Sequence, residues 1–130
     1  MMSYLLDTHA FLWFTDEAAQ LPLSMREFIE ESEDICISVA SFWEMTIKCS
    51  KGKLSLPRSI SETMRVCEEE LQFSILPVKN IHLETLRTLP WIHKDPFDRL
   101  MISQAISEDM TLVSADERVA EYPVCRLWKI

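Results

Sequence analysis

HKDPFDR, residues 93–99, joins two aspartates to a proline in a pattern typical of a helix start. Pro96 suits the first helical position because its φ is fixed near the helical value and it has no N–H to lose. Asp95 is then the expected N-cap. Apolar residues recur with helical spacing after it, so one face of the helix should pack on a core. Asp98 lies in the first turn beside that face, and we predict that it is functional rather than a second cap.

Strand-like segments alternate with helical segments along the rest of the chain. Short apolar or β-branched runs predict strands at 4–6, 35–39, 75–78, 111–114 and 124–128. Helices are expected at 9–14, 82–88 and 96–106. Three more helices are expected to end near residues 33, 52 and 72. Each of these begins with a serine and a glutamate at capping-box spacing: Ser24 with Glu27, Ser41 with Glu44, and Ser59 with Glu62. This alternation implies right-handed crossovers and a parallel sheet covered on both faces. The predicted fold class is α/β.

Length and composition predict one folded domain spanning residues 1–130. Hydrophobic residues make up 48% of the chain, which is enough for a substantial core without metal or disulfide staples. Lysine and arginine number 13 against 21 acidic residues, and the net charge of −8 argues against general adhesion to nucleic acid or anionic membranes. Any contact with nucleic acid must therefore be local.

The cysteines Cys36, Cys49, Cys67 and Cys125 are scattered, with no Cys-x-x-Cys pair and no histidines at zinc-finger spacing. This predicts buried reduced thiols rather than a disulfide framework or a zinc site. The N-terminus reaches Asp7 after only two leucines, which is too short an apolar run for a signal peptide or a membrane span. We expect a cytoplasmic protein without membrane contact.

Four acids are expected at the edge of the sheet where ligands bind. Asp7 and Asp116 follow predicted strands, whereas Glu44 and Asp98 lie in the first turns of predicted helices. The ligand crevice of a parallel α/β sheet lies outside the carboxyl ends of its strands, so the four side chains should converge there. Crowded carboxylates need a cation, and Mg²⁺ or Mn²⁺ with retained waters fits them. Such a metal can activate water and stabilise charge on a phosphodiester, so the pattern indicates a nuclease.

Each acid also has a capping explanation. Asp7 can cap a helix at His9, Asp116 can cap a turn at 117–120, and Glu44 can close a capping box with Ser41. Two other classes of function stay open. One is a non-catalytic binding module of the same fold within a protein complex. The absence of one of the four acids would indicate this alternative. The other is a phosphotransfer enzyme with Asp7 as nucleophile, similar to haloacid-dehalogenase-like phosphatases, although His9 stands where their second aspartate is expected.

Four motifs in this order resemble the PIN-domain ribonucleases, in particular the VapC-like toxins of bacterial toxin–antitoxin pairs. They are LLDTH at 5–9, SFWEM at 41–45 with Lys48, HKDPFDRLM at 93–101, and LVSAD at 112–116. The resemblance implies a PIN-like five-stranded parallel sheet flanked by helices and endonucleolytic cleavage of RNA. It also implies a Mg²⁺ or Mn²⁺ site at the family's acidic positions: Asp7, Glu44, Asp98 and Asp116. Ser114 keeps the hydroxyl of a threonine often found in the family.

Cationic residues near the acids are candidates for contacts with RNA phosphates. A stretch after the Glu44 helix could hold RNA, although a solvated helix end explains it equally: Lys48, Lys51, Lys53 and Arg58. Arg99, with Lys94 and His93, flanks Asp98 and could contact the scissile phosphate or only balance the acids. We expect three further residues to support the metal site: Asp95, Arg99 and Ser114.

The remaining aromatic and histidine residues are expected to be structural or to lie at interfaces. This applies to His9, to His82 and to the tryptophans at 13, 43, 91 and 128, for which base stacking is the weaker interpretation. The resemblance implies an antitoxin partner, and the aromatic surface around Trp13, Phe14 and Trp43 is predicted to receive an apolar helix from it. A homodimer stays an open alternative.

Overall fold

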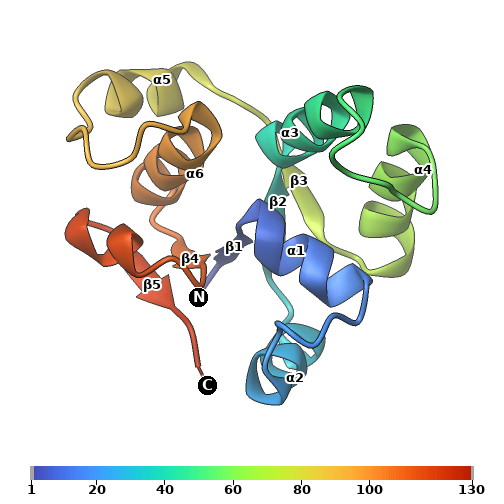
Figure 1. Cartoon of the computed structure of the whole chain (residues 1–130). Coiled ribbons are helices and arrows are strands. Elements are labelled where there is room, and N and C mark those ends of the chain that lie inside the picture. Colours follow the sequence, from blue (N-terminus) through green and yellow to red (C-terminus); the bar gives the residue numbers. More distant parts are fainter. Residues whose placement is uncertain (1, 130) are drawn as a thin grey trace.

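Five parallel strands form one sheet in the order β3-β2-β1-β4-β5 (Figure 1). The computed structural model describes residues 2–129. The strands are β1 (Tyr4–Leu6), β2 (Ile35–Ser38), β3 (Ser74–Leu76), β4 (Thr111–Val113) and β5 (Cys125–Leu127). The predicted α/β class and the five-stranded parallel sheet are confirmed. β3 lies at the sheet edge, which agrees with the proline that follows it.

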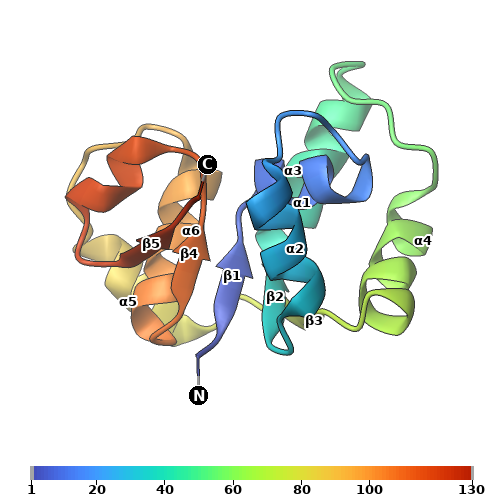
Figure 2. The ribbon, with the colours of Figure 1, turned by 90° about the horizontal axis from the view of Figure 1, so that it is seen from below.

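Helices cover both faces of this sheet, as two views at right angles show (Figure 2). They are α1 (Thr8–Thr15), α2 (Leu23–Glu31), α3 (Val39–Ser50), α4 (Ile60–Arg65), the π-helical η1 (Val66–Glu70), α5 (Asn80–Arg87), α6 (Pro96–Ser107) and the 3-10 helix η2 (Glu117–Glu121). Successive residues of β1 point to opposite faces, so Leu6 joins the core with Phe11 and Met45 while Leu5 joins the core with Met101. The carboxyl end of β1 therefore lies between the two helical layers.

The start of α6 agrees with its sequence. Asp95 is the N-cap, and its Oδ1 accepts the backbone N–H of Phe97 at 2.8 Å and that of Asp98 at 3.3 Å. Pro96 occupies the first helical position. The predicted cap is confirmed, because the side chain satisfies two N–H groups that have no partner within the helix.

Only one of the three predicted capping serines caps its helix. Ser59 Oγ accepts the N–H of Glu62 at 3.1 Å, as expected. Ser24 does not cap, because α2 begins one residue earlier at Leu23 with Pro22 at the N-cap. The pair of Ser24 and Glu27 has the right spacing for a capping box, but the fixed φ of the proline starts the helix before it.

The capping box predicted for Ser41 and Glu44 is also wrong. β2 runs directly into α3, which begins at Val39, and Ser38 Oγ accepts the N–H of Ala40 at 3.1 Å. Ser41 and Glu44 consequently lie inside the helix and both are buried. Capping therefore does not explain the carboxylate of Glu44.

The four cysteines are free thiols, but they are not all buried as predicted. Burial raises the pKa of Cys36 to about 11 and that of Cys67 to about 12, so both are neutral thiols at physiological pH. Cys125 is exposed on the edge strand β5, contrary to the expectation. Within residues 2–129, no helix has the length and apolar character needed to cross a membrane.

Candidate metal and catalytic site

Three of the four predicted acids line one small hollow at the carboxyl edge of the sheet. Asp7 follows β1, Asp116 follows β4, and Asp98 lies in the first turn of α6. Ser114, buried at the end of β4, lines the same hollow. The structure thus brings Asp7, Asp98, Asp116 and Ser114 together from three separate parts of the chain.

Asp7 both caps a helix and faces the hollow. Its Oδ1 accepts the N–H of Ala10 at 2.8 Å, so the capping explanation is correct for this residue. Burial nevertheless raises its pKa, and the charge of Glu44 raises it further, while hydrogen bonds from Ser114 and Ala10 lower it. A cap alone favours the ionised form, so the raised pKa marks a carboxylate held in a poorly solvated, negative environment.

The surroundings of Asp98 also raise its pKa. Burial raises its pKa to about 6, and the negative charges of Asp95, Glu44 and Asp7 raise it as well, against a lowering contribution from His93. Asp95 caps the same helix, whereas Glu44 and Asp7 belong to two other elements, so charges from across the sheet edge act on Asp98. Repulsion of this kind is relieved when a cation binds between the carboxylates.

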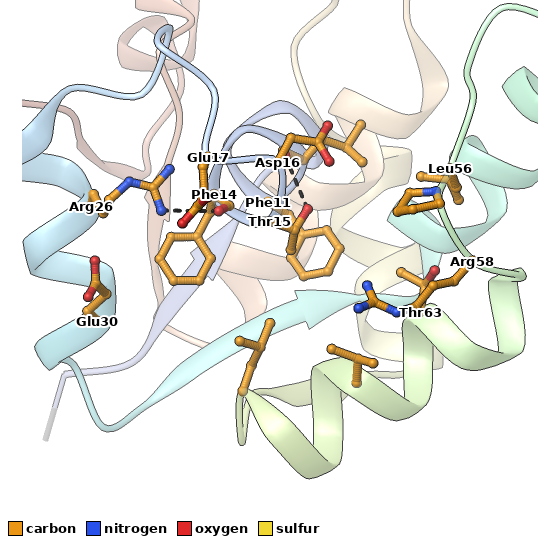
Figure 3. Close-up of a pocket in the computed structure, with 14 residues that line it drawn as sticks. Phe11, Phe14, Thr15, Asp16, Glu17, Arg26, Glu30, Leu56, Arg58 and Thr63 are labelled. Carbon is orange, nitrogen blue, oxygen red and sulfur yellow. Dashed lines mark hydrogen bonds between the residues drawn. The ribbon is translucent and has the colours of Figure 1, made fainter.

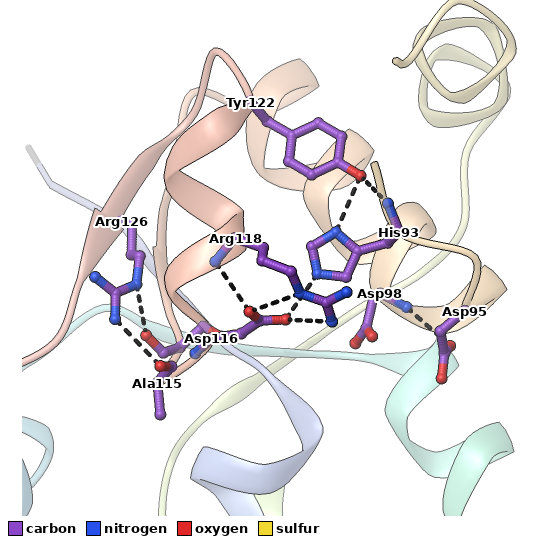
Figure 4. Close-up of polar contacts among 9 residues, drawn as sticks. His93, Asp95, Asp98, Ala115, Asp116, Arg118, Tyr122 and Arg126 are labelled. Atoms are coloured by element: carbon purple, nitrogen blue, oxygen red, sulfur yellow. Dashed lines mark hydrogen bonds and ion pairs between the residues drawn. The ribbon is translucent and has the colours of Figure 1, made fainter. Parts of the chain in front are cut away.

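Asp116 differs because cationic and N–H groups surround it (Figure 4). Its Oδ1 accepts the N–H of Arg118 at 3.0 Å, which caps η2, while its Oδ2 lies 2.7 Å from His93 Nε2 and 3.3 Å from Arg118 Nη2. Burial acts to raise the pKa of Asp116, but these hydrogen bonds outweigh it and hold the pKa at about 2. Asp116 is therefore ionised throughout the physiological pH range.

Glu44 lies beside this group but lines a neighbouring hollow, with Lys48, Lys51 and Asp95 among its other walls. Its Oε1 accepts the Thr8 hydroxyl at 2.7 Å, and its Oε2 pairs with Lys48 Nζ at 2.9 Å. Thr8 directly follows Asp7, which lines the first hollow, and its hydroxyl is bonded to Glu44, which lines the second. Full convergence of all four acids is not seen, because Glu44 is held by Thr8 and Lys48.

The cationic residues divide into two groups. Lys48 and Lys51 line the hollow beside Glu44 and remain candidates for contact with phosphates. Arg99 is only 3% exposed, and its guanidinium donates to the carbonyls of Pro90 and Leu89 at 2.7 and 3.2 Å. This geometry opposes the predicted contact of Arg99 with RNA, because the side chain holds the segment before α6. His93 is likewise buried, and its Nε2 is bonded to Asp116.

Asp7, Glu44, Asp98 and Asp116 suit a hard divalent cation in their chemistry, since all are oxygen donors. As the side chains lie here, no group of three or more His, Cys, Asp or Glu residues within 2–129 is close enough to share one ion. Mg²⁺, however, usually takes one or two protein carboxylates and keeps several waters. Burial and nearby negative charge raise the pKa values of both Asp7 and Asp98, and this is the observation that favours a cation at this hollow.

Thr8, Arg118 and Tyr122 were not singled out from the sequence. Thr8 Oγ1 lies within hydrogen-bonding distance of both Ser41 Oγ and Glu44 Oε1. Arg118 forms an ion pair with Asp116. Tyr122 contacts His93 at two points. Thr8 could have been found from its place next to Asp7, but the other two are identified only by the packing of η2 on the segment before α6.

The predicted docking surface is not one surface. Trp43 is 60% exposed and packs edge-on against Phe97, whereas Trp13 packs against Trp128. Phe14 instead lines a groove of about 480 Å³ between α1, α2 and the segment leading into α4 (Figure 3). The floor of this groove is apolar and its rim carries charges of both signs: Asp16, Glu17, Arg26, Glu30 and Arg58.

The structure is that of a small α/β protein with carboxylates at the carboxyl edge of its parallel sheet, and the family follows from comparison with known proteins. The model of the PIN domain family matches residues 4–124. The chain belongs to the PIN domain family, and the resemblance seen in its motifs is confirmed.

Individual relatives agree with this assignment. The chain is 22% identical over 123 residues to Ribonuclease VapC22 of Mycobacterium tuberculosis, covering 94% of this chain and 93% of the relative. Its fold is similar to that of VapBC2 from Rickettsia felis bound to a promoter DNA fragment, with a TM-score of 0.74, 17% identity, and 97% and 98% of the two chains covered. DNA-bound VapBC from Salmonella typhimurium gives a TM-score of 0.68 at 18% identity, with 98% of each chain covered.

Proposed function

We propose that this protein is a single-domain, metal-dependent endoribonuclease that acts as the toxin of a toxin–antitoxin pair. The observation that carries the proposal is the hollow lined by Asp7, Asp98 and Asp116, in which burial and neighbouring acids raise the pKa of two of the three carboxylates. Sequence similarity to a ribonuclease of the same family supports RNA as the substrate class.

The acids would have different roles in metal binding because their surroundings differ. Asp116 stays ionised and fixed at both oxygens, so it offers a permanent, oriented ligand. Asp98 and Asp7 would complete the site when the cation lowers their pKa values. Mg²⁺ or Mn²⁺, when bound, would supply a water of lowered pKa and stabilise charge on the phosphodiester. Glu44 would contribute through its charge and through Thr8, which links it to the strand end that carries Asp7.

Lys48 and Lys51 are proposed to hold the RNA backbone. They lie on one wall of the hollow beside Glu44, and the net charge of the whole chain is −8, so binding has to depend on such a local cationic patch. Replacing both lysines with glutamine should weaken RNA binding and flatten its dependence on salt. If this double variant cleaves RNA with the salt dependence of the wild type, the RNA backbone binds at a surface other than Lys48 and Lys51.

The test of the enzymatic proposal uses purified protein and RNA. The chain should cleave single-stranded RNA with Mg²⁺ or Mn²⁺ and become inactive with EDTA, and Asp98→Asn should be inactive in both. If the folded chain with all its acids leaves RNA intact under every metal condition, it is a non-catalytic binding module of the same fold.

An antitoxin helix is the partner we propose for the groove between α1, α2 and α4. Two of the structural neighbours are VapBC assemblies and a third is a toxin–antitoxin complex from Klebsiella pneumoniae. The groove has an apolar floor that includes Phe11, Phe14 and Leu56, which suits the apolar face of a helix.

Growth of a bacterial host tests this partnership. Expression of the chain alone should arrest growth, whereas Asp98→Asn should not, and the cognate antitoxin should restore growth. Leu56→Asp in the groove should prevent that rescue, while Leu23→Asp at a site 70% exposed and outside the groove should not. A folded wild-type chain that leaves growth unchanged would contradict the toxin assignment.

A further inference from the structure

His93 bridges the two ends of the 3-10 helix η2. Asp116 is the N-cap of this helix and Tyr122 is its C-cap. His93 Nε2 lies 2.7 Å from Asp116 Oδ2, and Nδ1 lies 3.0 Å from the Tyr122 hydroxyl (Figure 4). The two rings stack with their centroids 5.4 Å apart. His93 and Tyr122 are 1% and 4% exposed, so solvent does not compete for these contacts.

The hydrogen bonds of His93 are compatible with a neutral ring that carries its proton on Nε2. The Tyr122 oxygen accepts the backbone N–H of His93 at 2.7 Å, which leaves the proton of the hydroxyl available for Nδ1. Nδ1 is then the acceptor, and Nε2 carries the hydrogen that it donates to the Asp116 carboxylate. In this arrangement the Tyr122 hydroxyl favours the tautomer that donates to Asp116.

His93 also connects Asp116 with Asp98. It lies two positions before the N-cap Asp95 and five before Asp98, on the segment that leads into α6. Its bond to Asp116 therefore fixes the start of α6 relative to the end of β4, and both acids line the same hollow. The side chain of Asp116 is 31% exposed and lines the hollow, and its Oδ2 is the atom that His93 contacts.

We propose that His93, held in one tautomer by Tyr122, is a positioning residue that orients the Asp116 carboxylate toward a divalent cation and sets its separation from Asp98. The proposal rests on the proposed function, because it takes Asp116 and Asp98 as metal ligands. Partners that orient metal ligands in this way typically contribute about 10- to 100-fold in metal affinity.

The chain contains a matched control for this proposal. His82 is 0% exposed, its Nε2 lies 2.7 Å from Glu108 Oε2, and its Nδ1 accepts the N–H of Lys79 at 3.0 Å. This second buried histidine–carboxylate pair lies at the far end of α6, where Glu108 is the C-cap. Replacing it perturbs a buried histidine to a comparable degree without touching the acids of the hollow.

The experiment measures Mn²⁺ affinity by the loss of the free-ion electron paramagnetic resonance signal, together with RNA cleavage. His93→Leu should weaken Mn²⁺ binding about 10- to 100-fold. His93→Gln, whose amide can donate near the position of Nε2, should recover part of this loss, and Tyr122→Phe should show a smaller loss. His82→Leu should bind Mn²⁺ with wild-type affinity.

Four results would overturn the proposal. The first is wild-type Mn²⁺ affinity in folded His93→Leu, or in Tyr122→Phe if the leucine variant does not fold. The second is an equal loss in His82→Leu, which would show a general effect of disturbing the core. The third is a wild-type chain that neither binds Mn²⁺ nor cleaves RNA, in which case the proposed function fails as well. Metal-dependent cleavage that is unchanged in the His93 variants would overturn the positioning role alone.

Discussion

Asp95 Oδ1 accepts the backbone N–H of Asp98 at 3.3 Å, so the first of these two aspartates caps the helix on which the second is presented. Asp95 is exposed and carries the structural role. Asp98 is half-buried, lines the acidic hollow, and has its pKa raised by burial to about 6. Two identical side chains three residues apart are thus separated in role by their surroundings.

Asp95→Ala should destabilise the protein. The substitution removes the acceptor for the N–H groups of Phe97 and Asp98, which costs about 0.5 to 2 kcal/mol of unfolding free energy for a typical N-cap. Urea denaturation of metal-free protein measures this loss. Asp95→Asn is the control and should retain most of the stability, since asparagine caps about as well. An alanine variant as stable as wild type would show that the cap is dispensable.

Asp98→Asn should stabilise the metal-free protein, and only at the higher pH values. The carboxyl has a pKa of about 6 in the folded chain and about 4 when unfolded. Between these values the folded state binds a proton that the unfolded state has lost, so wild-type stability falls as the pH rises through this window. The neutral amide avoids that loss.

Melting temperatures in EDTA between pH 4 and pH 8 check the prediction for Asp98. The difference between Asp98→Asn and wild type should grow from pH 4 to pH 6 and then stay level. A variant that melts lower than wild type at pH 8 would mean that the Asp98 carboxylate stabilises the fold.

Mn²⁺ should raise the melting temperature of the wild-type chain. A ligand that binds only the folded state stabilises it by about 2.7 kcal/mol when present at 100 times its dissociation constant. Asp7→Asn should lose most of this gain, and because asparagine also caps helices and avoids burying a charge, its melting temperature without metal should not fall. An undiminished gain in Asp7→Asn would reduce Asp7 to a helix cap.

Thr8→Val should disturb Glu44 more than its small change in size suggests. The Thr8 hydroxyl donates to Glu44 Oε1 at 2.7 Å, and Glu44 is only 6% exposed. Leaving a buried charged acceptor without this donor costs about 1 to 3 kcal/mol. Thermal or urea unfolding measures the loss, and Thr8→Ser, which keeps the hydroxyl, should be near wild type. Equal stability of the valine and serine variants would refute a role for this bond.

Features encoded by neighbouring residues were predictable from the sequence. The strands and their parallel direction followed from the alternation of segments, and the cap at Asp95 followed from the adjacent proline. The start of α3 was not predictable in the same way, because Ser38 and Ser41 are both suitable caps and only the uninterrupted passage from β2 into α3 selects Ser38. A cap is a local signal, whereas the choice between two caps depends on the sheet.

Contacts between distant segments were beyond the sequence. Asp7, Asp98 and Asp116 could be placed at one sheet edge by the rule for parallel strands, but the bond of His93 to Asp116 spans 23 residues and depends on how η2 packs. The surroundings of Arg99 were equally beyond the sequence, because arginine is usually exposed, whereas every residue of α6 from 99 to 105 is buried. Its guanidinium is therefore bonded to carbonyls of the segment before the helix.

Cleavage of RNA by the purified wild-type chain, measured with Mn²⁺, with Mg²⁺ and with EDTA beside Asp98→Asn and Asp95→Asn, tests the role of the acidic hollow most directly. We expect cleavage by wild type and by Asp95→Asn with either metal, none with EDTA, and none by Asp98→Asn although that variant is folded. Cleavage that persists in EDTA, or in Asp98→Asn at the wild-type rate, would contradict a metal-dependent nuclease built on these carboxylates.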